Sequence, residues 1–344
     1  MAVASPIRVG IVGVGRAGWG MHRPELNGHG GYRIIAACDL VAERAQMLAD
    51  AADARAYTDY RDLVNDPEVD LVVVATRSDT HAEVDIAALE AGKHVVAEKP
   101  FATSLAEADR IIAAAAKARG RLLVRQNRRF DPAFLHIREI LASGRLGELY
   151  QVRLCRHGYQ RRNDWQTLRA FQGGQLNNWG PHIIDHALQL IAAPVASLWS
   201  DLRNVAAAGD AEDHLKIVLR GANGVVADIE ISGGVALGSP IWHLVGTQGA
   251  LVSDERSITL KWYDRAAMAP VSADPGDPPL EGGFANVEAI PWQSEEISVA
   301  PARPTSFYAE VHRALTEGST FPVSLEEARA VVQVTELARA GTGF

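Results

Sequence analysis

The sequence predicts two joined domains: a doubly wound α/β domain with a parallel sheet over residues 1–124, and an α+β domain with a large, mostly antiparallel open sheet over residues 125–344. In the first third, short apolar runs without polar alternation are separated by alanine-rich helical segments, which is typical of parallel strands covered by helices. Later strand-like runs follow one another through glycine turns such as Gly221-Ala222-Asn223-Gly224, which indicates antiparallel pairing.

The first domain is expected to alternate strands and helices along the chain. A Ser-x-x-Glu capping box, Ser104-Leu105-Ala106-Glu107, marks the start of its last helix. The expected strands are 7–12, 34–38, 71–75, 94–97 and 122–124, and the expected helices are 42–51, 81–91 and 105–119.

The second domain is expected to begin with a helix over 132–143 and to end with helices over 310–315 and 325–338. Proline and glycine concentrate from residue 264 to residue 304, which predicts long surface loops there. The expected strands are 149–157, 215–219, 225–231, 241–245 and 258–262.

Composition and charge exclude several classes of function. With 34 basic and 42 acidic residues, the chain has a formal net charge of -8 and lacks the basic excess that non-specific nucleic-acid binding requires, so no nucleic-acid partner is expected. Cys38 and Cys155 lie far apart without metal-ligand spacing, so we expect both to be buried and unpaired. The chain shows neither a signal peptide nor an apolar run long enough to span a membrane, so a cytoplasmic location is expected.

A glycine-rich motif, Gly13-Val14-Gly15-Arg16-Ala17-Gly18, follows the first expected strand and opens a helical segment. In such a motif Gly13 permits the tight turn, Gly15 lets the backbone approach a pyrophosphate, and Gly18 lets helix and strand pack closely. The helix N-terminus offers free N–H groups and a positive dipole to the phosphates. Asp39 ends the second expected strand, at the spacing that suits hydrogen bonds from ribose hydroxyls. These features predict a Rossmann-type dinucleotide site, the alternative being a glycine turn without a ligand.

Asp39 also bears on the choice of cofactor. Its carboxylate would repel the additional phosphate of NADP, and neither Leu40 nor Val41, which follow it, can hold that phosphate. Arg44 can reach it. We therefore expect NAD, with NADP as the less favoured alternative.

Three further segments accompany the glycine motif and Asp39. They are Ala97-Glu98-Lys99-Pro100, Asn127-Arg128-Arg129-Phe130-Asp131-Pro132 and Gly180-Pro181-His182-Ile183-Ile184-Asp185. In this combination the chain resembles the Gfo/Idh/MocA family of sugar and polyol oxidoreductases, with Glu-Lys-Pro as the most specific element. The resemblance extends from about residue 7 to residue 192, beyond which only the strand pattern matches. It implies a C-terminal open sheet that covers the nicotinamide and often forms subunit contacts, so a homodimer or homotetramer is expected.

The resemblance places Lys99 at the catalytic site and Glu98-Lys99-Pro100 in the nicotinamide site. Pro100 restricts Lys99 to an extended conformation, and a fixed ammonium can orient a hydroxyl and stabilise a developing alkoxide. The resemblance also places the catalytic histidine at His182, as the acceptor of the hydroxyl proton, a role that suits an imidazole. The alternatives are a solvated surface lysine and a structural pair of His182 with Asp185.

A polar stripe follows the helix that Gly180-Pro181 is expected to start. His182, Asp185, His186 and Gln189 share one face of this otherwise apolar helix. Asp185 can hold the tautomer of His182 or bind a substrate hydroxyl. The spacing of the two histidines also suits a metal, but zinc needs a third ligand and an open position, and the family needs no metal here, so none is expected.

Asn178 departs from the family pattern, because many members carry an aspartate four residues before the histidine. An asparagine can orient a hydroxyl, but it cannot take a proton or raise the pKa of the histidine by its charge. Three consequences are open: His182 acts alone, Asn178 serves a different substrate, or redox activity is lost. Arg77 also departs from the pattern by replacing the usual small residue or proline after Thr76, and it is expected to touch cofactor phosphate or ribose.

The remaining expectations concern the two ligands. Trp165, in the loop 158–180, packs either on sugar C–H surfaces or in the core, Arg128 is expected near the cleft, and Arg129 at the surface or between the domains. The expected cofactor-binding residues are Gly13, Gly15, Arg16, Ala17, Gly18, Asp39, Thr76, Arg77, His81, Glu98, Lys99 and Asn127. The expected substrate-binding residues are Lys99, Arg128, Trp165, Asn178, Asp185 and His186, and the expected catalytic residues are Lys99, His182, Asn178 and Asp185.

The function expected from these features is an NAD-dependent dehydrogenase that acts on a sugar, a sugar derivative or a polyol. One alternative keeps NAD bound, oxidises a sugar transiently and acts as a glycosidase, lyase or epimerase. A second alternative is a non-catalytic regulator that senses NAD, against which the intact Lys99 and His182 argue.

Overall fold

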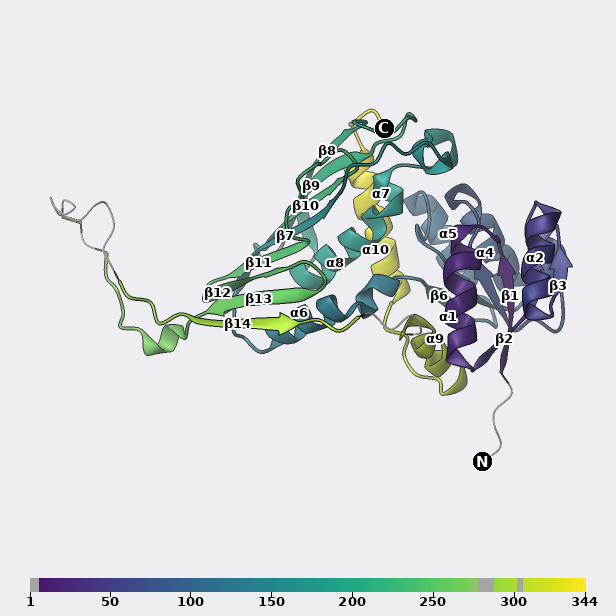
Figure 1. The fold of residues 1–344 in the computed structure, drawn as a ribbon, viewed down its shortest axis with the longest axis horizontal. Helices are drawn as coiled ribbons and strands as arrows, with labels where there is room; N and C mark the ends of the chain where they lie inside the picture. Colours follow the sequence, from purple (N-terminus) through teal and green to yellow (C-terminus); the bar gives the residue numbers. More distant parts are fainter. Residues whose placement is uncertain (1–5, 274, 277–287, 302–305) are drawn as a thin grey trace.

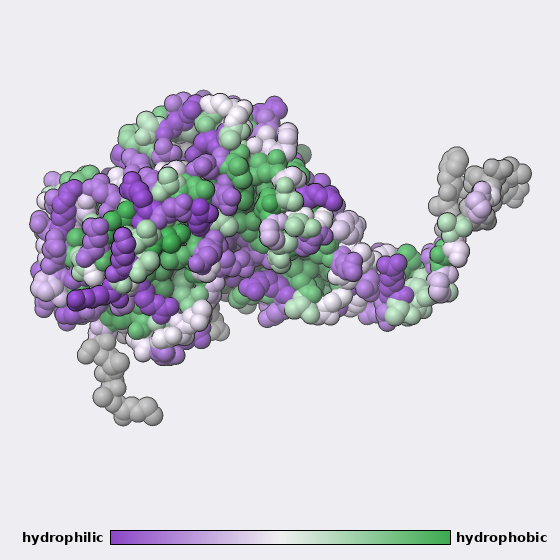
Figure 2. Space-filling model, turned by 180° about the vertical axis from the view of Figure 1, so that it is seen from behind, coloured by the Kyte–Doolittle hydropathy of each residue, from purple (hydrophilic) through white to green (hydrophobic). Residues whose placement is uncertain are grey.

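The computed structural model describes residues 6–273, 275–276, 288–301 and 306–344. Figure 1 shows a helix-covered sheet at one end of the molecule and a long open sheet at the other, with helix α10 between them. Figure 2 shows hydrophobic surface near the middle of the molecule. Among the described residues, no helix is both long and apolar enough to cross a membrane.

The first sheet is parallel, with strand order β3-β2-β1-β4-β5-β6. The order reverses between β1 and β4, where the carboxyl ends of the strands leave a crevice for a ligand. Its strands are β1 Ile7–Val12, β2 Tyr32–Cys38, β3 Arg55–Tyr57, β4 Leu71–Val74, β5 His94–Ala97 and β6 Leu122–Val124. Its helices are α1 Arg23–His29, α2 Ala42–Ala52, α3 Tyr60–Val64, α4 His81–Glu90 and α5 Leu105–Ala115.

The second sheet has eight strands in the order β14-β13-β12-β11-β7-β10-β9-β8. Only β7 and β10 pair in parallel, and helices α6, α8 and α10 lie on one face of the sheet (Figure 1). Its strands are β7 Leu149–His157, β8 Val195–Arg203, β9 His214–Gly221, β10 Val226–Ser232, β11 Trp242–Gly246, β12 Gly249–Ser253, β13 Ser257–Trp262 and β14 Gln293–Ser298. The helices of this part are α6 Pro132–Ala142, α7 Gln175–Asn178, α8 Gly180–Ile191, α9 Ser306–Thr316 and α10 Leu325–Arg339.

The predicted fold class is confirmed, and every expected strand lies within two residues of an observed one. Strands β3, β8, β12 and β14 and helices α3 and α7 were not predicted, and the helix expected over 105–119 ends at Ala115. The prediction of loops alone over 264–304 is wrong at β14, while residues 274, 277–287 and 302–304 of that range lie outside the described residues. Cys38 and Cys155 are buried and unpaired, as predicted.

The C-terminal segment packs against the first domain, so a single boundary at residue 124 does not describe the two domains fully. Phe307 and Tyr308 of α9 are buried in the same hydrophobic core as β1 and β4, and so are Phe321, Val323 and Val332. Helix α10 contacts both α5 of the first domain and α8 of the second. Residues 306–344 therefore join the two domains.

Candidate active site

The glycine loop after β1 has the geometry that its sequence predicts. Gly13 has φ +95, and a Cβ added to it would lie 2.5 Å from the carbonyl oxygen of Ala75. A Cβ on Gly18 would lie 2.0 Å from the carbonyl oxygen of Gly13. A Cβ on Gly15 would meet no described atom within 4 Å, so space remains beside its backbone. Gly13 and Gly18 are therefore required as glycines for packing, and Gly15 leaves room for a pyrophosphate.

Asp39 is fixed at the mouth of this loop. Its carboxylate oxygens accept hydrogen bonds from the backbone N–H groups of Val14, at 2.8 Å, and Val41, at 2.9 Å. The carboxylate therefore lies between the glycine loop and the end of β2, where the ribose of a dinucleotide follows its pyrophosphate. The next side chain, Leu40, is 92% exposed and offers no charge.

A segment of the second domain lies against the cofactor-binding edge of the first. Arg16 Nη2, in the glycine loop, donates to Gln166 Oε1 at 2.9 Å. The guanidinium of Arg77, after β4, lies 4.6 Å from the ring centre of Phe171 and 5.9 Å from that of Trp165. Trp165 thus contacts a predicted cofactor residue, and these contacts place residues 165–171 across the dinucleotide crevice.

Lys99 follows β5 and is positioned from behind by the buried carboxylate of Glu98. Glu98 Oε2 accepts from the backbone N–H of Lys99 at 2.9 Å, and its Oε1 accepts from Arg125 Nε at 2.8 Å and from His22 Nε2 at 3.0 Å. Burial acts to raise the pKa of Glu98, but the hydrogen bond from His22 and the charge of Arg125 lower it overall, so the group is ionised. The peptide bond between Lys99 and Pro100 is cis.

The chain around Glu98 forms a buried network that sequence reasoning missed. The hydroxyl of Tyr308, on α9, donates to His22 Nδ1 at 2.6 Å, because the other ring nitrogen of His22 donates to a carboxylate. Arg125 also binds both oxygens of Glu25, at 2.8 and 3.0 Å. The network therefore connects the end of β5 to α9 and fixes the backbone that presents Lys99.

Lys99 and Asn178 meet across the two domains. Lys99 Nζ lies 3.3 Å from both the carbonyl oxygen and the side-chain Oδ1 of Asn178. Burial lowers the pKa of Lys99; Glu98 opposes this effect, and the charges of Arg16, Arg125 and Arg162 add to it. The neutral side chain that replaces the usual aspartate is thus the direct partner of the ammonium.

His182 lies one turn after Asn178, in the first turn of α8, and is 6% exposed. Burial and the charges of Lys99 and Arg128 lower its pKa well below the ordinary value of 6.5, so the imidazole is neutral. Its Nδ1 is buried without a hydrogen-bond partner among the described residues. The ring of Trp179 meets it edge-on, with centroids 5.9 Å apart. A neutral imidazole beside an ammonium can accept a proton from a hydroxyl placed between them.

Helix α7 holds Asn178 in place through Glu212, another residue that sequence reasoning missed. The side-chain carboxylate of Glu212 accepts from the backbone N–H of Leu176 at 2.8 Å. The backbone carbonyl oxygen of Glu212 accepts from Gln175 N at 3.0 Å. Gly174 has φ +101, and a Cβ there would lie 2.3 Å from the carboxylate oxygens. Only glycine therefore lets Glu212 cap this short helix.

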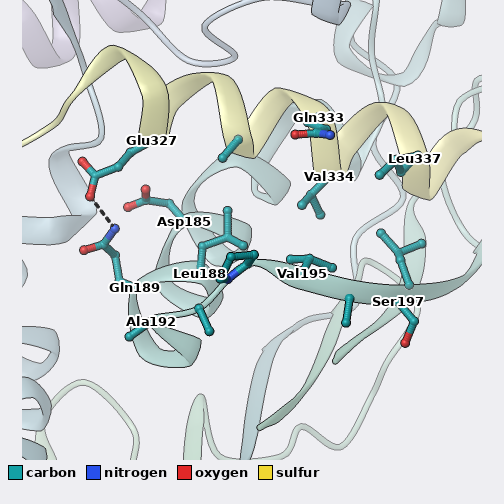
Figure 3. A pocket seen from close by; sticks show the side chains of 15 residues that line it. Asp185, Leu188, Gln189, Ala192, Val195, Ser197, Glu327, Gln333, Val334 and Leu337 are labelled. Carbon is teal, nitrogen blue, oxygen red and sulfur yellow. Dashed lines mark hydrogen bonds between the residues drawn. The ribbon is translucent and has the colours of Figure 1, made fainter. Parts of the chain in front are cut away.

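The expectation that Asp185 orients His182 is wrong, because Arg129 occupies its carboxylate. Arg129 Nε and Nη2 donate to Asp185 at 2.7 and 2.6 Å, and Arg129 also pairs with Glu327 of α10. Arg129 therefore lies between the domains, which is one of the two locations predicted for it, and its side chain is buried. Figure 3 shows Asp185 and Glu327 in a groove of about 950 Å³ between α8, β8 and α10, which neither Lys99 nor His182 lines.

His186 is also occupied, which contradicts its expected role toward substrate. It is 2% exposed, stacks on Phe134 with ring centroids 3.9 Å apart, and its Nε2 donates to the carbonyl oxygen of Arg128 at 3.0 Å. Burial lowers its pKa to about 3. In the part of the chain that the structure describes, no group of three histidine, cysteine or acidic side chains can hold a metal ion.

Two expected cofactor residues have side chains that are occupied within the protein. His81 is 2% exposed, and its ring nitrogens face the carbonyl oxygens of Pro100, at 2.9 Å, and Thr76, at 3.2 Å. Glu98 is occupied by the network described above. Both side chains fix the loops around the crevice, and the contact of these two residues with a cofactor stays a prediction.

The other predicted ligand contacts remain predictions. Asn127 begins the turn after β6 and is partly buried, and Thr76 Oγ1 accepts from Thr80 Oγ1 at 2.9 Å. Arg128 pairs with Asp131 at 2.9 Å, and its guanidinium lies 5.0 Å from the ring centre of Trp179. Arg128 is therefore on the same side of the cleft as His182.

Both halves of the chain match models of one protein family. Residues 7–126 match the model described as "Oxidoreductase family, NAD-binding Rossmann fold", and residues 134–252 match the GFO/IDH/MocA C-terminal domain. The oxidoreductase YdgJ of Escherichia coli (strain K12) is 31% identical over 96% of this chain and 95% of its own. The chain belongs to the Gfo/Idh/MocA oxidoreductase family.

Other relatives extend this assignment over the whole length. The scyllo-inositol 2-dehydrogenase (NADP(+)) IolW of Bacillus subtilis (strain 168) is 28% identical over 96% of this chain and 92% of its own. The solved structure of an NAD-binding protein from Listeria innocua has a TM-score of 0.82 and 27% identity, and covers 98% of this chain and 95% of that chain. The N-terminal domain of this Gfo/Idh/MocA protein is thus an NAD-binding domain, and the open space beside Gly15 and the fixed carboxylate of Asp39 fit the pyrophosphate and ribose of NAD.

Proposed function

We propose that this oxidoreductase is an NAD-dependent dehydrogenase that acts on a secondary hydroxyl group of a sugar, a sugar derivative or a polyol. The observation that carries the proposal is the meeting of Lys99, Asn178 and His182 beside the dinucleotide crevice, with Lys99 Nζ 3.3 Å from Asn178 Oδ1. Relatives named inositol 2-dehydrogenase, among them one from Acidothermus cellulolyticus that is 33% identical over 78% of this chain, support a polyol or sugar as the class of substrate.

In this mechanism the residues of the chain place the hydroxyl and remove its proton. The Lys99 ammonium donates to the hydroxyl oxygen and stabilises the negative charge that develops on it. His182, neutral because burial lowers its pKa, accepts the proton. Asn178 holds Lys99 through two oxygens and contributes no charge. Bound NAD supplies the acceptor for the hydride that leaves the carbon.

Two substitutions test the assignment with NAD binding as a separate readout. We expect Lys99→Ala and His182→Ala each to lower turnover at least about tenfold, since one acid–base or electrostatic group typically contributes about a hundredfold or more. NAD affinity, measured by calorimetry, should stay within about threefold. Lys117→Ala, at an exposed position in the turn after α5, and His136→Ala, on α6 with a side chain that is 41% exposed, are matched controls. Near-normal turnover of His182→Ala would overturn the base assignment.

The proposed cofactor preference is NAD over NADP, because the Asp39 carboxylate would face the additional phosphate and Leu40 offers it no charge. The relative IolW is named as an NADP(+) enzyme, so the family does not decide the choice. The test is the ratio of kcat/KM with the two cofactors, and a ratio that favours NADP would refute the preference.

A second candidate function is transient oxidation with retained NAD, as in a glycosidase, lyase or epimerase. The observation that favours it is the contact of residues 165–171 with Arg16 and Arg77 across the crevice, which would slow the release of a dinucleotide. NAD that survives purification, together with sugar products formed without net reduction, would support this candidate. Net accumulation of NADH with an added substrate would support the dehydrogenase.

The expected homodimer or homotetramer also remains a proposal. The sheet face opposite α8 and α10 carries the exposed Trp199, at 58%, on β8, and a partly buried ion-pair cluster of Lys216, Asp228 and Glu230. Light scattering coupled to gel filtration measures the molar mass directly, and a monomer at micromolar concentration would refute the proposal.

A further inference from the structure

His182, the proposed base, lacks the polar restraint that a neighbouring acid would give to its ring. Both oxygens of Asp185 are occupied by Arg129, at 2.6 and 2.7 Å. Asn178 Oδ1 is occupied by Lys99, at 3.3 Å. The Nδ1 atom of His182 is buried and has no hydrogen-bond partner among the described residues. The direction in which this imidazole points must therefore be set by packing.

The indole ring of Trp179 is the aromatic neighbour of this imidazole. The two ring centroids are 5.9 Å apart, and the ring planes meet at 67°. The two residues share one turn, because the backbone N–H of His182 donates to the carbonyl oxygen of Trp179 at 3.1 Å. In a closely packed site an indole at this distance blocks rotation of the imidazole toward it. The place of the Trp179 ring therefore limits the directions open to Nε2 of His182.

Two arginines hold the indole ring in turn. The guanidinium of Arg156, on β7, lies over the ring of Trp179 at 4.1 Å from its centre. The guanidinium of Arg128 lies over the same ring at 5.0 Å. A guanidinium stacks on an indole through its charge and through its flat shape, and a lysine reproduces only the first of these. The ring of Trp179 can therefore turn only by losing these two contacts.

Each of the two arginines is fixed by one carboxylate. Arg156 Nη1 donates to Glu255 Oε1 at 2.9 Å. Arg128 Nη1 donates to Asp131 Oδ2 at 2.9 Å. Burial raises the pKa of Asp131; the charges of Arg128 and Arg156 oppose this shift, and the charge of Glu255 adds to it. The four side chains thus form one cluster of balanced formal charge, which suits the support of a ring and not the binding of an ion.

The backbone of Glu255 indicates that its side chain is needed. Glu255 lies in the turn between β12 and β13 with φ +79, in the left-handed region that favours glycine. Asp254 Oδ1 fixes this turn by accepting from the backbone N–H groups of Arg256, at 3.0 Å, and Ser257, at 2.9 Å. A side chain kept in such a conformation is typical of a functional site, and the contact that Glu255 makes there is with Arg156.

We infer that Glu255, Arg156 and Trp179 are positioning residues for His182. Glu255 fixes Arg156, Arg156 holds the indole of Trp179, and the indole directs the imidazole. Packing thus does for this base what a buried carboxylate does for the histidine of other acid–base sites. The inference rests on the proposed dehydrogenase function and adds to it residues of β7 and of the β12–β13 turn, which no sequence motif indicates.

The first experiment measures NADH formation by Arg156→Gln, alone and combined with His182→Ala. The probes are myo-inositol, D-glucose, D-galactose and D-glucitol, and the one oxidised fastest is used throughout. We expect Arg156→Gln to lower kcat about fivefold or more and to leave KM and NAD affinity within about threefold, because a displaced base costs turnover and not binding. In the His182→Ala protein the same substitution should change kcat by less than about twofold. An unchanged kcat of the single variant, or an equal loss in both backgrounds, would overturn the inference.

The matched control is Arg145→Gln. The guanidinium of Arg145 lies 5.2 Å from the ring centre of Trp262, on β13, and pairs with Glu295, on β14. It therefore makes the same kind of stack between an acid, an arginine and a tryptophan, without His182. The kcat of this control should equal that of the original protein.

Two further variants separate positioning from general stability. Arg156→Lys should recover part of the kcat lost in Arg156→Gln, because it keeps the charge and loses the flat shape. Glu255→Gly should lower kcat about threefold or more while Tm stays within about 2 °C, because glycine fits the turn that glutamate strains. A Glu255→Gly protein with full kcat would overturn the assignment of Glu255.

Crystal structures of the NAD-loaded original and Arg156→Gln proteins test the positioning without any substrate. We expect the indole of Trp179 to turn in the variant, and the imidazole of His182 to shift by about 1 Å or to occupy more than one orientation. Identical positions of both rings would overturn the inference. If the original protein oxidises none of the probes, the proposed function fails, while the ring positions still decide whether the stack positions His182.

Discussion

Replacing Asp185 by asparagine separates a catalytic role of the polar stripe on α8 from a structural one. In the structure both oxygens of Asp185 accept from Arg129, at 2.6 and 2.7 Å, and both side chains are buried. Removing one partner of a buried ion pair costs about 3–5 kcal/mol, because the other charge stays buried. Arg129 would keep Glu327 and the carbonyl oxygen of Pro322, so we expect the lower end, about 3 kcal/mol. With an unfolding entropy of about 0.7 kcal/mol/K for 344 residues, Tm should fall by about 4 °C.

The assay for Asp185→Asn pairs calorimetric unfolding with kcat/KM, measured well below the transition. The matched control is Asp109→Asn, which removes the same kind of partner from Arg329 at the surface, where the two side chains are 52% and 36% exposed. An exposed pair contributes less than about 1 kcal/mol, so Tm of this control should change by less than about 1.5 °C. For Asp185→Asn we expect kcat/KM within about twofold of the original protein. An unchanged Tm together with a tenfold loss of kcat would refute the structural role and return Asp185 to the catalytic site.

Three other substitutions address the cofactor, the catalytic lysine and a buried acid. Asp39→Ala should weaken NAD binding about tenfold by removing a charged hydrogen-bond acceptor, and an unchanged Kd would refute the ribose contact. Asn178→Asp should raise the pKa of Lys99, because a carboxylate would replace an amide 3.3 Å from Nζ, so the alkaline limb of the pH profile of kcat should move to higher pH; a limb that does not move belongs to another group. Asp85 has no hydrogen-bond partner among the described residues, and burial raises its pKa well above the ordinary 3.8. The folded protein therefore keeps a proton on Asp85 that the unfolded chain has already lost, so the free energy of unfolding falls as pH rises from 3.8 to the raised pKa of the folded state. Asp85→Asn should therefore stabilise the protein more at pH 7 than at pH 5 in urea unfolding, and an equal effect at both would exclude titration of Asp85.

The strands that sequence patterns predicted and those they missed differ in where they lie in the sheets. The predicted strands of the first sheet are continuous apolar runs because both of their faces are covered. Strands β3, β8 and β14 were missed, and all three lie at the edge of a sheet. An edge strand is exposed along one side, so β14 is polar except for Ile297 and β8 exposes Trp199, and neither has the alternation of a half-buried strand. Strand β12 lies inside its sheet but has only five residues and starts with glycine.

The site was predictable where its chemistry is local and unpredictable where it depends on distant partners. The glycine loop and Asp39 were predicted from the spacing of a short motif, and Lys99 and His182 from the resemblance to the family; the structure places Lys99 and His182 near each other, while their roles stay predictions. Glu98 is bound by His22 and Arg125, and His22 is bound in turn by Tyr308. These three residues come from distant parts of the chain, and no spacing in the sequence indicates that their side chains are buried together. The stripe on α8 was correctly recognised as one face, but helical spacing cannot show that the Asp185 on it is occupied by Arg129.

The absence of an acid beside Lys99 has a consequence for where negative charge is stable in this site. Glu98 acts on the lysine through its charge, but its oxygens are held by the backbone of Lys99, by Arg125 and by His22. The ammonium of Lys99 is therefore bound only by neutral oxygens of Asn178 on its open side. A substrate that becomes an alkoxide there supplies the missing negative charge at the moment the proton moves to His182, so the interaction is stronger in the transition state than in the ground state, which is the condition for it to raise kcat.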